Sequence, residues 1–187
     1  LAFLLRVDRL VSRMSLAIET NGLTRCFGDL RAVDDLNLRV EAGTFYGFLG
    51  PNGAGKSTTI KMLTGLLAPT RGAMRILGKD TTDAEKARQV KQHIGVVPEE
   101  LALFDNLTGH EYLTFIGRMY RLPMATVRER CRELLAMMNL DDEKKKLTLE
   151  YSHGMKKKLT LAAALIPNPD LLFLYLKRFS FRTGTTF

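Results

Sequence analysis

The pattern of apolar and polar residues divides the chain into a strand-rich first half, a helical segment and a short strand near the end. Residues 36–40 alternate between apolar and polar side chains, which predicts a strand with one solvent-facing side. Residues 45–49 are apolar at nearly every position, which predicts a strand buried on both faces. This order indicates an antiparallel layer that leads into a central parallel strand. Further short strands are predicted at residues 17–23, 73–77, 94–97 and 171–174.

Apolar residues at helical spacing lie between these predicted strands. One helix is predicted over residues 58–67, and a charged, exposed helix over residues 83–92 has Asp83 as a possible cap. A helical insert is predicted over about residues 104–155, and another helix starts at Lys156. The two apolar stripes of the insert are Tyr112, Phe115, Ile116 and Met119, with Thr108 as a cap, and Val127, Cys131, Leu134, Leu135 and Met138.

A glycine-rich stretch between the strand at residues 45–49 and the following helix matches the phosphate-loop pattern G-x-x-x-x-G-K-[ST]. Side chains at Gly53 or Gly55 would obstruct the curl that turns successive amides inward. Lys56 can reach the β- and γ-phosphates of a nucleotide, and the Ser57 hydroxyl can ligate Mg²⁺. The predicted phosphate-binding residues are Gly50, Pro51, Asn52, Gly53, Ala54, Gly55, Lys56, Ser57 and Thr58.

Composition limits the organisation of the chain without deciding its partner. The 187 residues, 45% of them hydrophobic, are enough for one domain with a real core. The net charge of +8 permits an acidic partner such as nucleic acid or anionic lipid, but a nucleotide site alone also favours positive charge. Cys26 and Cys131 lack metal-ligand spacing and are interpreted as free thiols. Residues 1–13 are expected to lie outside the domain, with a short amphipathic helix as the alternative.

Four motifs in this order resemble the nucleotide-binding subunits of ABC transporters over about residues 16–174. Residues 50–58 are similar to the Walker A motif of that family, and residues 23–28 to its adenine-stacking loop. Residues 97–100 stand where the family has its Q-loop. The last motif, residues 151–155, is similar to the family's signature motif, in a wording typical of subunits that pair with separate exporter-type membrane subunits.

The resemblance implies roles for individual residues. Phe27 would stack on adenine, although it could instead belong to the core. Glu99 replaces the usual glutamine and could ligate Mg²⁺ or cap a loop. The signature motif would close on the ATP of a second, head-to-tail subunit, through the start of the helix that follows it. Its residues are Tyr151, Ser152, His153, Gly154 and Met155. The lysine runs at residues 144–146 and 156–158 are interpreted as a solvated face.

The resemblance breaks after residue 174. The family has an aspartate and a glutamate after this apolar strand, whereas Tyr175 and Leu176 stand here and no acidic residue follows Asp170. No catalytic residue is therefore identifiable, and a missing general base costs roughly 10²–10⁴-fold in rate. Asp170 lies at the wrong end of the strand to replace either residue. The tail at residues 175–187 diverges from the family, and the strand at residues 171–174 is expected to be exposed and prone to aggregation.

The sequence predicts an α/β fold, a P-loop NTPase three-layer core with an antiparallel side sheet and a helical insert, incomplete at the C-terminus. The domain is expected over residues 14–174. By resemblance, the chain is an ATP-binding subunit using ATP and Mg²⁺, with doubtful hydrolysis, a transmembrane permease partner and a second nucleotide-binding subunit. It would be cytoplasmic and peripheral at the inner face of the membrane. The alternatives are a non-hydrolytic regulatory module that binds ATP, or a nucleic-acid- or ribosome-associated ABC ATPase.

Overall fold

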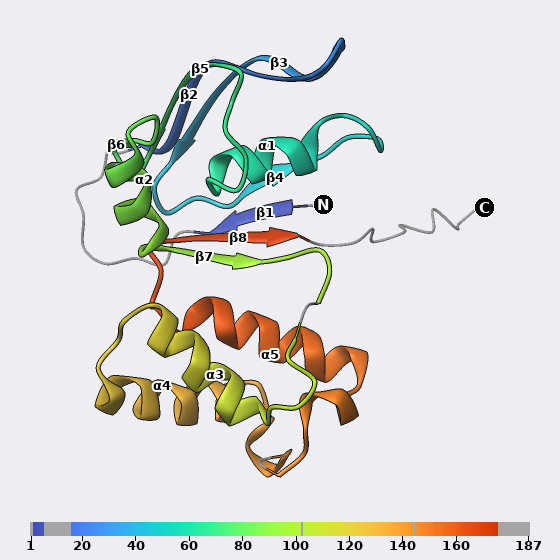
Figure 1. Cartoon of the computed structure of the whole chain (residues 1–187), viewed down its shortest axis with the longest axis vertical. Coiled ribbons are helices and arrows are strands. Elements are labelled where there is room, and N and C mark those ends of the chain that lie inside the picture. Colours follow the sequence, from blue (N-terminus) through green and yellow to red (C-terminus); the bar gives the residue numbers. More distant parts are fainter. Residues whose placement is uncertain (1, 6–15, 102, 144, 176–187) are drawn as a thin grey trace, which may run out of the picture.

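The computed structural model describes residues 2–5, 16–101, 103–143 and 145–175. Figure 1 shows two layers of strands in the upper part of the molecule and a group of helices below them. One four-stranded sheet has the order β3-β2-β5-β6 and the other the order β4-β1-β8-β7. The main hydrophobic core lies between these two sheets and includes side chains of α1. The α/β fold with an antiparallel side sheet and a helical insert is therefore confirmed.

The first sheet is antiparallel and is built around the long hairpin of β2 (Leu16–Phe27) and β3 (Leu30–Glu41), with β5 (Arg71–Ile76) and β6 (Lys79–Asp80) beyond β2. Both hairpin strands are longer than predicted. Residues 24–27 lie beyond the predicted strand, within the expected adenine-stacking loop, and they continue β2 instead. The sequence pattern missed this continuation because tertiary hydrogen bonds stabilise it.

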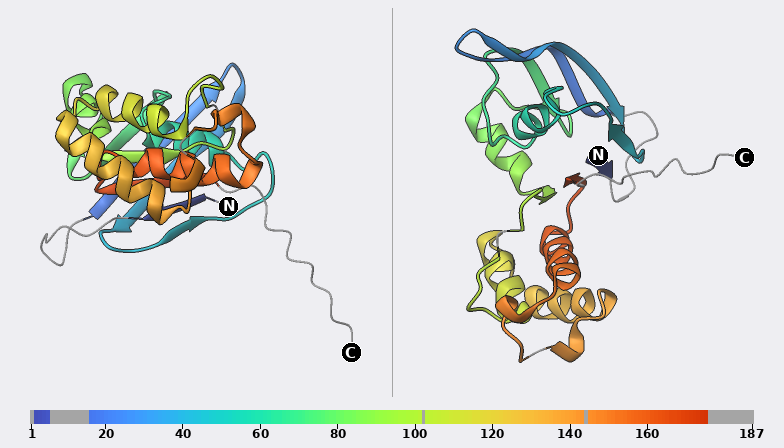
Figure 2. Two further views of the ribbon diagram at one scale, coloured as in Figure 1. Left: turned by 90° about the horizontal axis from the view of Figure 1, so that it is seen from below. Right: turned by 90° about the vertical axis from the view of Figure 1, so that its right-hand side faces the viewer.

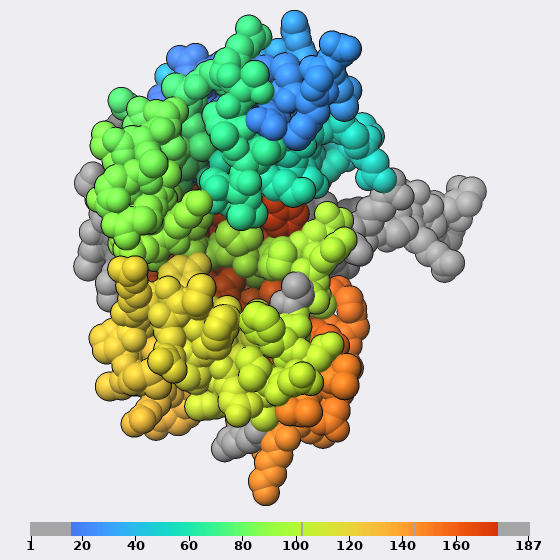
Figure 3. Space-filling model, viewed as in Figure 1, coloured from blue at the N-terminus to red at the C-terminus, as the bar shows by residue number. Residues whose placement is uncertain are grey.

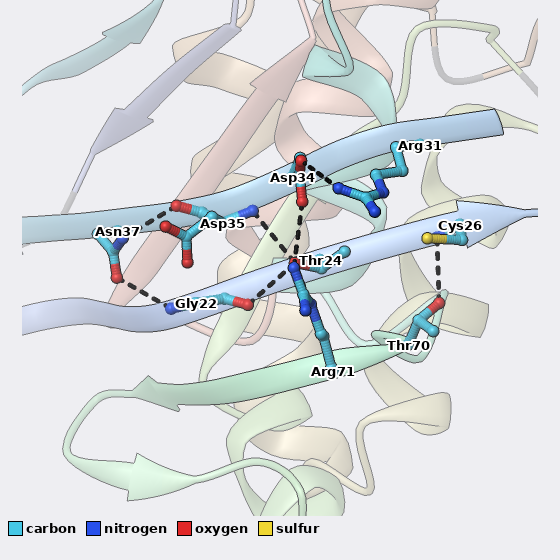
Figure 4. Close-up of polar contacts among 9 residues, drawn as sticks. All are labelled: Gly22, Thr24, Cys26, Arg31, Asp34, Asp35, Asn37, Thr70 and Arg71. Atoms are coloured by element: carbon cyan, nitrogen blue, oxygen red, sulfur yellow. Dashed lines mark hydrogen bonds and ion pairs between the residues drawn. The ribbon is translucent and has the colours of Figure 1, made fainter.

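Figure 4 shows the polar contacts that hold this part of the first sheet together. The Thr24 hydroxyl accepts hydrogen bonds from the Asp35 amide at 3.1 Å and from Arg71 Nε at 3.2 Å, and it donates to the Gly22 carbonyl at 3.1 Å. The Asp34 carboxylate pairs with Arg31 at 3.0 Å and with Arg71 at 3.3 Å. These contacts join β2, β3 and β5, so they fix the sheet close to the β2–β3 turn.

The second sheet contains three mutually parallel strands and one that runs against them. Strand β1 (Ala2–Leu5) lies between β4 (Tyr46–Phe48) and β8 (Leu171–Tyr175) and is antiparallel to both, while β7 (Ile94–Val97) pairs in parallel with β8.

Three expectations about the second sheet are wrong. Residues 2–5, expected outside the domain, form a strand of the sheet; the rest of that expectation, residues 6–13, lies outside the described residues. Strand β8 is not an exposed edge, because β1 and β7 flank it and Phe173 is fully buried. Strand β4 is only half-buried, and its flanking residues Phe45 and Leu49 are exposed, so it is not buried on both faces.

Two helices accompany the sheets: α1 (Lys56–Leu63), which follows the phosphate loop, and α2 (Ala84–Lys91). The Asp83 carboxylate accepts a hydrogen bond from the Lys86 amide at 2.9 Å, so the predicted cap of α2 is confirmed. Helix α1 begins two residues earlier and ends four residues earlier than predicted. Gly65, with φ of 68°, follows its end, as expected for a left-handed residue after a helix C-terminus.

The helical insert shares a core with the helix that follows it. This core is formed by α3 (Gly109–Met119), α4 (Met124–Met137) and α5 (His153–Leu165), with short 3₁₀ turns at Asp141–Glu143 and Thr148–Glu150. Thr108 and Glu111 form a reciprocal capping box at the start of α3. The predicted stripe of α4 is buried, except that Met138 is only partly buried. In α3 the predicted stripe is split, because Tyr112 packs inside whereas Phe115 and Met119 are exposed.

The insert and the strand-rich part form two lobes joined at β7 and β8. Figure 2 shows the helices as a layer of their own beneath the second sheet, and the space-filling view in Figure 3 shows β8 at the junction of the lobes. A small buried cluster of Val97, Ala164 and Leu172 packs α5 against these strands. The helices, the second sheet and the antiparallel sheet with α1 therefore follow one another as layers.

Candidate functional site

The phosphate loop connects β4 to α1 at the edge of the second sheet where the parallel strands have their carboxyl ends (Figure 1). In open α/β sheets this edge is where ligands bind. The loop curls through left-handed glycines, with φ of 84° at Gly53 and 76° at Gly55. These angles are costly for any residue with a Cβ atom, so the loop conformation depends on glycine.

The two glycines are required for different reasons. A Cβ atom on Gly55 would lie 2.3 Å from the Ala32 carbonyl oxygen and 3.1 Å from Val33 Cγ2, so the loop lies directly against β3 at this point. A Cβ atom on Gly53 would meet nothing within 4 Å. We expected side chains at both positions to obstruct the curl. A steric clash confirms this for Gly55, whereas Gly53 is constrained by its backbone angle alone.

The start of α1 offers backbone donors to an anion. Its N-cap residue is Gly55, and no side chain caps the helix there, so the first amides lack a side-chain acceptor. The positive end of the helix dipole lies at the same place. Lys56 Nζ donates hydrogen bonds to the carbonyls of Gly50 and Pro51, the first of them at 2.7 Å. The ammonium group is thus folded over the loop, and the geometry suits an anion held between the amides and Lys56.

The carboxyl ends of β7 and β8 carry the other residues at this edge. Glu99 follows β7 and is exposed, and Tyr175 ends β8. Burial, together with the negative charge of Glu99, raises the pKa of Tyr175 to about 12. The phenol is therefore neutral at physiological pH. Among the residues that the structure describes, no group of three or more His, Cys, Asp or Glu side chains could hold a metal ion.

Asp170 cannot act at this edge. It precedes β8, at the amino end of the strand, and its carboxylate lies 3.0 Å from His93 Nδ1, which precedes β7. The Asp170 amide also donates to the His93 carbonyl at 2.8 Å. The interaction therefore joins the starts of two parallel strands, at the opposite end from the phosphate loop, as we expected from its sequence position.

Phe27 ends β2 close to the phosphate loop. The residue is 46% exposed, so it does not belong to the core. Two residues before it, Arg25 pairs with Val33, and Val33 Cγ2 would lie 3.1 Å from a Cβ atom on Gly55, so this end of β2 is near the loop. The Arg25 guanidinium, which no sequence motif singled out, lies 4.6 Å from the centre of the Phe27 ring. Residues i and i+2 share a face of a strand, and that spacing could have revealed the pair.

The motif at residues 151–155 forms the beginning of α5 and lies in the helical lobe. The Ser152 hydroxyl accepts a hydrogen bond from the Met155 amide at 3.2 Å, so Ser152 is the N-cap. The helix therefore begins at His153, three residues before the predicted start. Tyr151 is buried, which raises the pKa of its hydroxyl, whereas His153 and Gly154 are exposed. Figure 1 shows this end of α5 in the lobe opposite the phosphate loop, across β7 and β8.

The lysine runs are not uniformly solvated. Lys156 Nζ lies 4.0 Å from Asp105 Oδ1, and Lys146 pairs with Glu143 at 2.7 Å. Lys157 and Lys158 are exposed as expected, and Lys144 lies outside the described residues.

Both cysteines in the described part of the chain are unpaired, Cys131 in the core of the insert and Cys26 partly exposed. No helix in the described ranges is long and apolar enough to cross a membrane.

Comparisons with known proteins place these observations in a family. The family model described as "ABC transporter" matches residues 33–174. The daunorubicin/doxorubicin resistance ATP-binding protein DrrA of Streptomyces peucetius is 45% identical over 84% of this chain and 47% of its own length. The probable multidrug ABC transporter ATP-binding protein YbhF of Escherichia coli is 40% identical over 84% of this chain and 27% of its own. The chain thus spans about half or less of the length of these curated relatives.

Solved structures agree with the sequence comparisons. The dimeric structure of MJ0796, a bacterial ABC transporter cassette, superposes with a TM-score of 0.72 at 26% identity, over 81% of this chain and 70% of that one. The same cassette is also known in a dimeric post-hydrolysis state bound to ADP and Pi. Together with the phosphate loop, the antiparallel side sheet and the helical insert, these matches show that the chain belongs to the ABC transporter family of ATP-binding proteins.

Proposed function

We propose that this chain is the ATP-binding part of a transporter subunit, in which residues 50–58 hold the phosphates of ATP. The observation that carries the proposal is the uncapped start of α1 beside the left-handed Gly55, with Lys56 folded over the loop. When ATP binds, the Lys56 ammonium exchanges its two carbonyl partners for phosphate oxygens, and the free amides of the loop and helix donate to the same group. The binding of ADP and Pi by the MJ0796 cassette supports this proposal.

Phe27 is proposed to stack on the adenine ring. Its half-exposed ring lies near the phosphate loop, and base–aromatic stacking contributes on the order of 1–3 kcal/mol in nucleic-acid systems. Arg25 already covers one face of the ring, which leaves the other face for the base. The proposed arrangement is therefore a three-layer stack of guanidinium, phenyl ring and adenine.

The donors at this edge fit a weakly held Mg²⁺. The ion usually keeps several waters and takes one or two protein ligands together with phosphate oxygens. The Ser57 hydroxyl and the Glu99 carboxylate are exposed and can serve in this way. The neutral Tyr175 phenol stands where the family has a carboxylate, so we expect ATP binding with very slow hydrolysis. This residue also favours the second candidate, a non-hydrolytic ATP-binding regulatory module.

We propose two protein partners. A second cassette, arranged head to tail, would receive residues 151–155 on its own ATP, and the exposed start of α5 with Lys157 and Lys158 suits a phosphate group. The MJ0796 cassette, which is dimeric, supports this proposal. Subunits of this kind are cytoplasmic and peripheral at the inner face of the membrane, which is the location that we propose here.

A transmembrane permease would be the other partner, bound at an apolar groove on α3. The groove has a volume of about 640 Å³, and the exposed rings of Phe104 and Phe115 lie 5.2 Å apart beside it. Exposed aromatic side chains of this kind suit an amphipathic helix from a partner protein. The residues that line the groove are Leu107, His110, Glu111, Thr114, Phe115, Arg118 and Met119.

The proposed function is tested by the binding of a fluorescent ATP analogue to Lys56→Ala and to Lys61→Ala. Lys61 is an exposed lysine of the same helix that does not take part in the loop, so it controls for the loss of one positive charge. Loss of charge-assisted hydrogen bonds to phosphate should weaken binding about 10- to 100-fold in Lys56→Ala only. Equal affinities of both variants, or no binding by the unmodified chain, would reject the site.

A measurement of ATP turnover distinguishes the two candidates. Binding without detectable hydrolysis, even with Mg²⁺ in excess, favours the regulatory module. Turnover at a rate within about tenfold of an intact ABC ATPase would contradict our expectation, because loss of a positioned general base costs about 10²–10⁴-fold.

A further inference from the structure

The helical lobe has a buried tyrosine directly before the exposed start of α5. Tyr151 is 5% exposed and belongs to the hydrophobic core that α3, α4 and α5 share. The next residue, Ser152, is the N-cap of α5, and the two residues after it, His153 and Gly154, are exposed. The motif that we propose binds the ATP of a second cassette is therefore attached at one end to a fixed side chain.

The Tyr151 hydroxyl lies against the backbone of Gly109, the first residue of α3. A Cβ atom on Gly109 would lie only 2.6 Å from the hydroxyl oxygen, so the hydroxyl fills the place that a side chain would take. The backbone of Gly109 is helical, so this contact, and not the backbone angle, requires glycine here. Burial raises the pKa of Tyr151, and a hydrogen bond from the Gly109 backbone partly opposes this rise.

The chain before Tyr151 is also tied to the chain before α3. Thr148 donates two hydrogen bonds of 2.8 Å, from its amide to the Leu107 carbonyl and from its hydroxyl to the Phe104 carbonyl. The Leu149 amide donates to the Asp105 carbonyl at 3.2 Å. The Tyr151 side chain continues this series of contacts up to the residue before the N-cap, so the starts of α3 and α5 are held at a fixed separation.

We propose that Tyr151 is a positioning residue, which holds residues 152–155 against the start of α3 and so fixes where α5 presents its first amides to a phosphate. The same start of α3 lines the groove proposed for the permease with His110 and Glu111. Tyr151 therefore joins the two proposed protein-binding surfaces through one contact. The phosphate-binding role of residues 152–155 rests on the function proposed above, whereas the contact of Tyr151 with Gly109 does not.

The contact is tested by Gly109→Ala in three backgrounds: the unmodified chain, Tyr151→Phe and Tyr112→Phe. In the unmodified chain the new methyl group meets the hydroxyl, so we expect the midpoint of thermal unfolding to fall on the order of 5 °C. In Tyr151→Phe the nearest atoms left are Cζ of residue 151 and Leu159 Cδ1, both at 3.5 Å, so we expect no fall or a small rise. Tyr112, another buried tyrosine of the same core, is the matched control. An equal fall in all three backgrounds would overturn the proposal.

The positioning role is tested by ATP-dependent self-association, measured by sedimentation well below the unfolding midpoint. We expect Gly109→Ala to weaken self-association about tenfold, because the start of α5 is displaced. The ATP affinity of the monomer should not change, because the phosphate loop lies in the other lobe. Adding Tyr151→Phe should restore most of the loss, and adding Tyr112→Phe should restore none. Unchanged self-association in Gly109→Ala, or the same recovery from both phenylalanines, would overturn the positioning role.

Hydrogen exchange of backbone amides addresses the same question without ATP. The amides of Met155 and Lys156 donate to Ser152 at 3.2 Å and 2.9 Å, so they report on the start of α5. We expect both to exchange at least about fivefold faster in Gly109→Ala and to recover when Tyr151→Phe is added. Unchanged exchange would overturn the proposal. If the unmodified chain binds ATP but does not self-associate, the second-cassette partner of the proposed function is wrong, and this measurement still decides whether Tyr151 positions α5.

Discussion

The molecule contains two helix starts that follow a loop at its proposed ligand-binding surfaces, and they are built in opposite ways. Helix α1 begins after Gly55, in the left-handed conformation and without a side-chain cap. Helix α5 begins after Ser152, whose hydroxyl accepts a hydrogen bond from the Met155 amide. The first helix start therefore leaves its amides for a ligand, and the second satisfies one of them internally.

This difference separates binding from stability. A helix N-terminus has four amides without partners in the helix, and a side-chain cap stabilises the protein by about 1 kcal/mol. Helix α1 has no side-chain cap, at the place where an anion can supply the acceptors instead. Helix α5 keeps it, in a lobe with its own core, so residues 151–155 are held in place without a ligand. Substitutions at the two helix starts should therefore affect different measurements.

The largest effect is expected from Gly55→Ala. The new Cβ atom would clash with the Ala32 carbonyl, and the left-handed backbone would be strained, so the loop must move. We expect ATP affinity to fall on the order of 100-fold. Gly53→Ala is the matched control, because it has the same kind of backbone angle with open space around it. The ATP affinity of Gly53→Ala should fall by about tenfold at most.

Isothermal titration with ATP measures both glycine variants, and thermal unfolding shows whether the fold survives. A loss in Gly53→Ala as large as that in Gly55→Ala would mean that contact with β3 does not matter. The start of α1 would then differ from the start of α5 only by its left-handed glycine backbone and its missing cap.

The contrast also shows what a sequence can reveal about such a site. Glycines, a lysine and a serine at fixed spacing predicted the phosphate loop because their chemistry is local. Helix α5 starts three residues before the predicted position, because Ser152, whose residue type favours a cap, begins it. The contact of Gly55 with Ala32 and the insertion of β1 join residues far apart in sequence, so neither leaves a local pattern. The exposed Phe115 and Met119 show that helical spacing alone does not determine which side of a stripe is buried.

A smaller effect is expected at the start of α5. Ser152→Ala removes the side-chain cap and should lower the free energy of unfolding by about 1 kcal/mol. The affinity of the monomer for ATP should not change, because this helix start lies in the other lobe. Ser57→Ala is the matched variant in α1, where no side-chain cap is lost. It should change the free energy of unfolding by no more than about 0.5 kcal/mol and reduce the Mg²⁺ dependence of ATP binding.

Denaturant unfolding and ATP titration with and without Mg²⁺ measure this pair of serine variants. An unchanged stability in Ser152→Ala would show that the cap contributes little. A weaker ATP affinity of monomeric Ser152→Ala would show that the two helix starts are not independent, contrary to the separation of binding and stability argued above.

The smallest effect concerns Tyr175, which lies at the phosphate-loop edge and has no counterpart at the start of α5. Burial, and then the charge of Glu99, raises its pKa to about 12, above the value near 10 of an unfolded tyrosine. The folded chain therefore holds this proton more tightly, and the associated stability is fully present below about pH 10 and is lost as the pH rises towards 12. Tyr175→Phe should flatten this part of the stability curve.

The ultraviolet absorbance of the phenolate, taken as the difference between the chain and Tyr175→Phe, gives the titration directly. Glu99→Gln should lower the pKa of Tyr175, because it removes the negative charge that opposes ionisation while burial remains. If the pKa of Tyr175 is the same in Glu99→Gln, Glu99 is too far from the end of β8 for the two to act on one metal ion. A lowered pKa would support the view that the carboxyl ends of β7 and β8 form one electrostatic unit beside the phosphate loop, in which a neutral phenol stands in place of a second carboxylate.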